Sequence, residues 1–178
     1  MKKHIVLFIL VSMMTGYAVT AQKFAGMQKS PTDIAYARTN RDTKPDIKVI
    51  YSRPQKKDRE IFGKLVPYDA VWRTGADEAT EIRFFKDMKM GDNEIKAGTY
   101  SLFTIPGANE WTIIINSDTD VWGAYSYDES KDIARIQVPV LEGKSLDAFS
   151  ITFMDTKNGY DMALGWDDVM VKVPFTTL

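Results

Sequence analysis

The richest set of chemically capable residues lies between Tyr51 and Thr80. This segment combines aromatic side chains, three arginines, carboxylates, glycine and proline, and it joins two segments that alternate like strands. Connections longer than about 12–15 residues are usually functional or disordered, and this one is too apolar for disorder. We therefore expect a long structured loop that forms a binding surface.

Five residues of this segment are the candidate ligand-binding residues. Arg53 and Arg73 could grip an anion through their planar guanidinium groups. Tyr68 and Trp72 could stack on a flat ligand or a sugar ring, and Glu78 adds a carboxylate. The pattern indicates recognition of a glycan, a peptide or a cell-envelope component.

The same segment also permits a purely structural interpretation. Trp72 would then close one end of the fold, and Arg73 would pair with Asp77 or Glu78. Long loops often pack on themselves, and tryptophan is highly buried on average. Both interpretations stay open at the level of sequence.

Carboxylates are the side chains that could support acid–base catalysis in this chain. Such chemistry needs two carboxyl groups about 5–9 Å apart across a cleft, as in glycosidases. No spacing in the sequence places two of them in that way, so the catalytic residues are unknown. The candidates are Asp69, Asp77, Glu78, Asp118, Asp120, Asp128, Asp167 and Asp168.

Histidine and cysteine are nearly absent. The chain has no Cys and a single His, His4, which lies in the segment that we expect to be removed. The mature protein would then lack Ser-His-Asp and Cys-His catalysis, Cys/His zinc sites and disulfides. Residues 116–120 alternate oxygen ligands, but Val121 and Tyr127 stand where an EF-hand requires Gly and Glu. We predict no metal and no cofactor.

The N-terminus has the order of a secretory signal peptide. Two lysines are followed by an apolar run at 5–11 and then by small residues ending at Ala21. The apolar run is shorter than the ~20 residues that a spanning helix needs. We predict a signal peptide at 1–21, cleavage near Ala21, and a periplasmic or secreted protein with neither a membrane span nor a lipid anchor.

The charge balance bears on the class of partner. The chain has 23 basic and 24 acidic residues, and loss of Lys2 and Lys3 leaves 21 against 24, a net charge of about −3. Nucleic-acid binding requires a basic surface that replaces phosphate counterions. The balance therefore argues against a nucleic-acid partner.

The rest of the chain reads as an all-β domain. Apolar–polar alternation and recurring turn residues predict strands through residues 47–173. We expect a single β domain at 46–178, preceded by an extended lead-in at 22–45. The expected architecture is an antiparallel two-sheet sandwich, with a jelly roll as one form that it could take. Separate strands are expected at 122–127, 162–166 and 169–173, with a turn at Asp167-Asp168.

Several blocks together resemble the family catalogued as domain of unknown function 2911, many of whose members are exported proteins of Gram-negative Bacteroidota. The resemblance implies a compact β domain and supplies no catalytic residue. Position 77 is Asp where the resemblance implies Asn. The blocks lie at 51–54, 61–68, 71–80, 97–107, 111–112 and 122–125.

Three functions are consistent with these observations. The first is an exported non-enzymatic binding domain whose contact surface is the 51–80 region. The second is a histidine-free hydrolase or lyase that uses carboxylates. The third is a structural envelope protein whose exposed strand edges pair with a partner.

Overall fold

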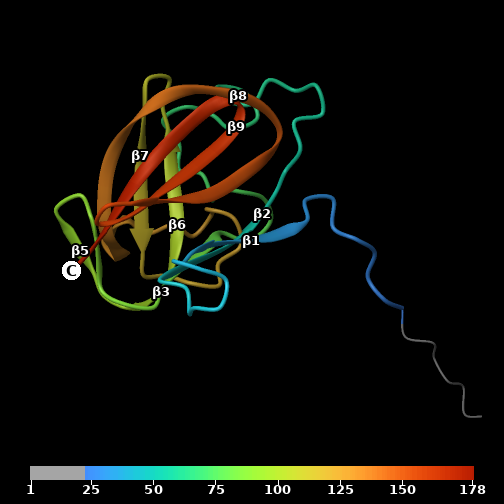
Figure 1. The fold of residues 1–178 in the computed structure, drawn as a ribbon. Coiled ribbons are helices and arrows are strands. Elements are labelled where there is room, and N and C mark those ends of the chain that lie inside the picture. Colours follow the sequence, from blue (N-terminus) through green and yellow to red (C-terminus); the bar gives the residue numbers. More distant parts are fainter. Residues whose placement is uncertain (1–22) are drawn as a thin grey trace, which may run out of the picture.

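The computed structural model describes residues 23–178. The signal peptide expected at 1–21 therefore lies outside the described residues. Figure 1 shows the arrangement of the strands. They are β1 (Thr32–Ala37), β2 (Ile47–Ser52), β3 (Thr80–Phe84), β4 (Met88–Met90), β5 (Asn93–Ile95), β6 (Gly98–Pro106), β7 (Glu110–Asn116), β8 (Asp132–Thr156) and β9 (Gly159–Thr177), with one 3₁₀ turn, η1 (Glu129–Lys131).

The strands form one open antiparallel sheet in the order β1-β2-β3-β6-β7-β8-β9-β4-β5. The all-β prediction is confirmed. The division into two sheets is not confirmed, because the long strand β8 pairs with β7 through its first part and with β9 through the rest. One continuous hydrogen-bonded ladder therefore connects all the strands.

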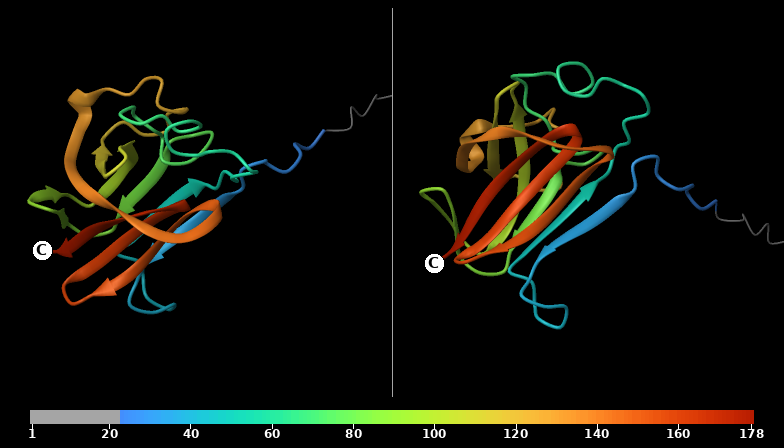
Figure 2. Two further views of the ribbon diagram at one scale, coloured as in Figure 1. Left: turned by 90° about the horizontal axis from the view of Figure 1, so that it is seen from above. Right: turned by 45° about the horizontal axis from the view of Figure 1, so that its top comes forward.

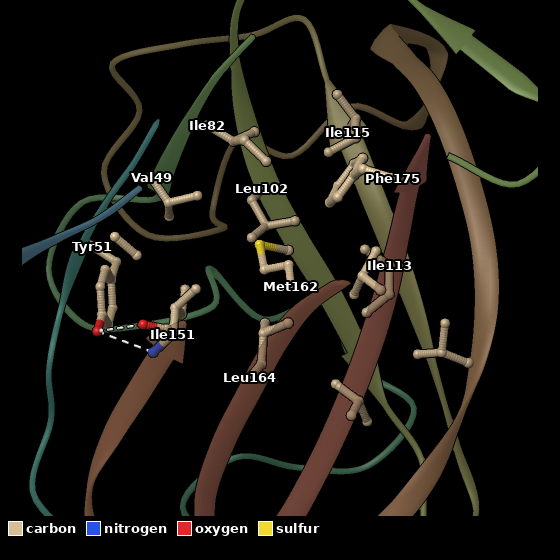
Figure 3. Close-up of a cluster of buried hydrophobic side chains, with 14 of the residues drawn as sticks. Val49, Tyr51, Ile82, Leu102, Ile113, Ile115, Ile151, Met162, Leu164 and Phe175 are labelled. Carbon is tan, nitrogen blue, oxygen red and sulfur yellow. Dashed lines mark hydrogen bonds between the residues drawn. The ribbon is translucent and has the colours of Figure 1, made fainter. Parts of the chain in front are cut away.

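Alternation along the strands creates the core. In β2, for example, Ile47, Val49 and Tyr51 are buried while the residues between them are partly exposed. Figure 3 shows side chains of β2, β3, β6 and β7 facing those of β8 and β9. The facing residues include Val49, Ile82, Leu102, Ile113 and Ile115 on one side, and Ile151, Met162, Leu164 and Phe175 on the other.

A buried phenol joins the two sides of this core. The Tyr51 hydroxyl accepts a hydrogen bond from Ile151 N at 3.0 Å and donates to Ile151 O at 3.4 Å (Figure 3). Burial raises the pKa of Tyr51, so the neutral phenol that can make both bonds is favoured.

The segment that follows β2 pairs with the middle of β8. Phe149 N donates to Pro54 O at 3.0 Å, and Lys56 N donates to Asp147 O at 2.6 Å. These bonds hold the start of the loop at residues 53–79, hereafter the 53–79 loop, against β8. Figure 2 shows that the loop extends over one end of the sheet.

Some local features differ from the expected strands. Strand β1 lies within the expected lead-in and pairs with β2. Residues 122–127 form turns instead of a strand, and Gly123 there has a φ of +66°. Asp167, at φ 55°, does not end a strand, since β9 continues through it opposite a β8 register shift.

Candidate ligand-binding site

The 53–79 loop is structured because it hydrogen-bonds to a part of the β6 edge that β3 does not reach. Strand β3 pairs with β6 only as far as Leu102, which leaves the next residues of β6 without a partner on that side. Trp72 and Thr104 exchange backbone hydrogen bonds of 2.7 and 3.0 Å there, and Asp69 N donates to Pro106 O at 2.9 Å. The loop thereby satisfies β6 backbone groups that would otherwise lack a partner.

The loop concentrates left-handed backbone conformations. Among non-glycine residues Lys57, Asp58, Asp69, Thr74 and Asp77 have φ between 49° and 61°. Thr74 is the most costly of these, because a β-branched side chain rarely adopts this region. Such strain persists only where surrounding contacts hold it, and it clusters at functional sites.

Trp72 forms the centre of an aromatic cluster beneath the loop. It is buried, and its Nε1 donates to Gly75 O at 3.1 Å. Its ring packs against four other aromatic rings at centroid distances of 5.0–6.2 Å. These rings belong to Phe62, Trp111, Phe149 and Trp166. Trp72 is therefore buried and packed against other rings, as the structural interpretation expects.

A cavity of about 520 Å³ lies between the loop, the segment before β1 and Trp166 of β9. Its volume falls within the usual range of small-molecule sites. Trp72 and Arg73 both line it, so two of the five predicted site residues meet there. The other lining residues are Lys29, Ser30, Pro54, Gln55, Lys57, Arg59, Leu65, Val66, Pro67, Ala70, Val71, Gly75, Ala76, Asp77 and Trp166.

Arg73 has an unusual environment. Its Nε is buried and has no hydrogen-bond partner within residues 23–178. The pairing with Asp77 or Glu78 expected under the structural interpretation is not formed, since no ion pair of Arg73 occurs in the described part of the chain. An unsatisfied buried donor costs about 1–3 kcal/mol, and the described residues do not offset this cost at Arg73.

Arg53 has the opposite environment. Its Nε donates to Phe149 O at 3.1 Å, Nη1 to Asp33 at 2.9 Å, and Nη2 to Ser150 Oγ at 2.7 Å. All three nitrogens are therefore engaged. Arg53 connects β1 to β8 and does not line the cavity.

Tyr68 and Glu78 lie apart from the cavity lining. Tyr68 is partly exposed, and its ring covers Gly63, where a Cβ would approach Tyr68 Cε2 to 2.8 Å. Glu78 lines a second hollow of about 220 Å³ together with Glu81 and Asp120. The sequence prediction thus combined residues that the fold distributes over separate surfaces.

Four cationic or aromatic residues of the cavity wall were not among the predicted site residues: Lys29, Lys57, Arg59 and Trp166. The run Lys56-Lys57-Asp58-Arg59 is a basic cluster inside the loop, and this signal could have indicated two of them. Arg59 is held by donating its Nε to Lys56 O at 2.9 Å. Lys29 and Trp166 come from distant segments, and only the fold brings them to the wall.

The cavity wall contains one carboxylate, Asp77, and therefore no carboxylate pair for acid–base catalysis. Asp87 and Asp128 have lowered pKa values, because Asp87 accepts a hydrogen bond from Ala97 N and Asp128 accepts from Ser130. Neither lines the cavity. No cluster of three or more His, Cys, Asp or Glu side chains suited to a metal ion occurs in residues 23–178.

A family model described as protein of unknown function (DUF2911) matches residues 30–175. The chain belongs to this family. The region shared with the DUF2911 family begins just before β1 and ends within β9, so it includes nearly all of the cavity wall. No curated protein and no solved structure matches the chain. No helix in the part of the chain that the structure describes has the length and apolar character to cross a bilayer.

The backbone conformation at position 77 favours an Asn or Asp. Asp77 has a φ of 61°, a conformation that Asn and Asp adopt more readily than other side-chain-bearing residues. Asp77 O accepts a hydrogen bond from Gly123 N at 3.0 Å. The backbone of this position therefore accounts for an Asn or Asp, independently of any role for the side chain.

Proposed function

We propose that this protein is a non-enzymatic binding domain, exported and released from its signal peptide near Ala21, that binds a ligand in the cavity beneath the 53–79 loop. The ligand is a glycan, a peptide or a cell-envelope component. The observation that carries the proposal is the cavity itself, since it is lined by Trp72 and Arg73 together. A concave site with an apolar wall and a few polar groups is the usual form of a ligand site.

The 53–79 loop supports this function through its rigidity. Its backbone is bonded to β6 and β8, and its Phe62 and Trp72 side chains are buried in the core. A loop fixed in this way loses little conformational entropy when a ligand binds. Binding residues are often carried on loops that a rigid scaffold positions.

A stability-shift screen of the mature protein against sugars, sugar acids, peptides and envelope fragments tests the proposal. A ligand of the folded state raises the unfolding midpoint in a concentration-dependent way. Ala70 is exposed and lines the cavity, so A70F should fill the site without changing the core and should abolish the shift.

The matched control is A108F, which places the same ring on an exposed loop outside the cavity. The control should keep the full shift. An equal shift in A70F and the unmodified protein would place binding elsewhere and would refute the proposed site.

A further inference from the structure

We infer that the cavity recognises an anionic group, a carboxylate or a phosphate, that is bound by the guanidinium of Arg73. This inference rests on the proposed binding function and specifies the chemical class of the ligand. Three observations carry it, namely the local charge, the unsatisfied Arg73 Nε, and the support that holds Arg73 in place.

The charge of the cavity wall differs from that of the chain as a whole. The chain carries a formal net charge of −1, whereas the wall has four cationic side chains and one carboxylate, Asp77. The four cations, Lys29, Lys57, Arg59 and Arg73, form no ion pair within residues 23–178. Converging unpaired cations repel one another, and a bound anion would relieve that repulsion.

The ion pairs of the fold lie outside the cavity wall. Each ion pair found in the described part of the chain uses a cation outside the cavity wall. These cations are Arg53, Lys56, Lys86, Lys96, Lys131 and Arg135. Cations elsewhere in the described chain, such as Lys48, Lys89 and Lys172, are unpaired as well. The cavity is therefore distinguished by its excess of cations over carboxylates and not by the lack of ion pairs.

The Arg73 side chain has the donor that an anion would use. A guanidinium can bind a carboxylate or phosphate through two parallel N–H groups. The buried Nε has no acceptor in the described residues, so the guanidinium of this cavity-lining residue is not committed to a partner within the fold. Lys29, Lys57 and Arg59 would add positive charge around a bound anion.

The residue after Arg73 fixes this arrangement. Thr74 is fully buried at a φ of 56°, and its Oγ1 lies 3.1 Å from Thr104 Oγ1. Thr74 O accepts a hydrogen bond from Thr80 Oγ1 at 2.7 Å, and Arg73 O accepts one from Thr80 N at 3.1 Å. These contacts hold a strained backbone that presents Arg73 to the cavity before any ligand binds.

Trp72 and Trp166 add an apolar surface that the ligand should also match. Both line the cavity, so a ligand that carries a ring beside its anionic group would contact apolar surface as well as charge. Glucuronate and glucose are suitable probes, because they share a sugar ring and differ in the carboxylate. Glucose 6-phosphate distinguishes a phosphate from a carboxylate.

The experiment is an NMR titration of the mature protein that follows the Arg73 Nε–Hε resonance. We expect glucuronate, glucose 6-phosphate or both to shift this resonance saturably, and glucose to shift it much less. R73M keeps the aliphatic stem and removes the donors. It should weaken binding of the anionic probe, measured on backbone amides of the cavity wall, by roughly tenfold or more.

Two further variants separate a local effect from a general one. R83M removes an exposed arginine that lies over the Phe85 ring outside the cavity, and it should leave binding unchanged. D77N removes the one carboxylate of the wall while suiting the left-handed backbone there, and it should tighten binding.

The outcomes separate this inference from the proposed function. If glucose shifts the cavity resonances as strongly as the anionic probes, the cavity binds ligands but the anion requirement is wrong. If R73M and R83M weaken binding equally, Arg73 is not the anion contact. If none of the three probes shifts the Arg73 resonance at 50 mM, roughly the weakest affinity that charge and one ring should give, the inference fails, while the stability-shift screen still decides the proposed function.

Discussion

Trp72 and Trp166 stack with their ring centroids 6.2 Å apart and their planes inclined by 17°. One comes from the 53–79 loop and the other from β9, and both line the cavity. The pair therefore joins the loop to the sheet and forms an aromatic wall of the candidate site. Trp72 is both packed in the core and part of the cavity wall, so its burial does not conflict with the proposed role in binding.

Removal of the Trp72 ring should destabilise the protein strongly. W72A deletes a buried side chain that contacts four aromatic rings, and such changes cost about 3–5 kcal/mol in the free energy of unfolding. Urea denaturation measures this loss. W122A is the control, because Trp122 is 61% exposed and its removal should change stability by no more than about 0.5 kcal/mol. Similar losses in both variants would contradict the packing described for Trp72.

The contrast between Trp72 and Arg73 shows what could be predicted from sequence. Composition and loop length indicated that both residues belong to a special segment, and the structure brings both to the cavity. Sequence could not show that the Arg53 guanidinium is fully hydrogen-bonded while Arg73 Nε is not. The partners of Arg53 lie far away in the chain. Arg53, for example, depends on Phe149 and Ser150 of β8.

The positions of several strands were predictable from the sequence. Alternation reports burial of one face of a strand, so β2, β3, β6 and β7 follow the sequence closely. The pairing order was not predictable, since β8 continues through register shifts and serves both β7 and β9. Local patterns do not report which strands a long strand will pair with.

The buried Thr74–Thr104 contact should be measurable by a double-mutant cycle. T74V and T104V each leave the other hydroxyl without its partner 3.1 Å away, and each should cost about 1–3 kcal/mol. Valine is β-branched like threonine, so the backbone strain at position 74 is nearly unchanged. The double variant should lose about 1 kcal/mol less than the sum of the single variants. Simple additivity would mean that the two hydroxyl groups do not interact.

Tyr160 should make stability fall at alkaline pH. Burial and the hydrogen bond to Asp46 at 2.7 Å raise the pKa of Tyr160 to about 12, whereas an unfolded tyrosine titrates near pH 10. The folded state keeps the proton where the unfolded chain has lost it. This stabilisation is therefore fully present below about pH 10 and is lost as the pH rises toward 12.

The test compares the free energy of unfolding of Y160F and the unmodified protein from about pH 9 to 12. Y160F should show the shallower decline, because phenylalanine has no proton to lose. Y125F alters an exposed ring and is the control that should retain the original slope. Identical slopes in all three proteins would show that the Tyr160 proton does not contribute.

The stability of R53M and R73M without ligand is the most direct test of the assignment of Arg73 to a ligand. Both variants keep an aliphatic stem and remove a guanidinium. R53M should lower the free energy of unfolding by about 1–3 kcal/mol, because Asp33 loses its ion-pair partner and Phe149 O loses a donor. R73M should leave stability unchanged or raise it, since it removes a buried donor that has no partner in the described chain and one of four neighbouring cations. A loss in R73M as large as that in R53M would show that Arg73 serves the fold, and would contradict its assignment to a ligand.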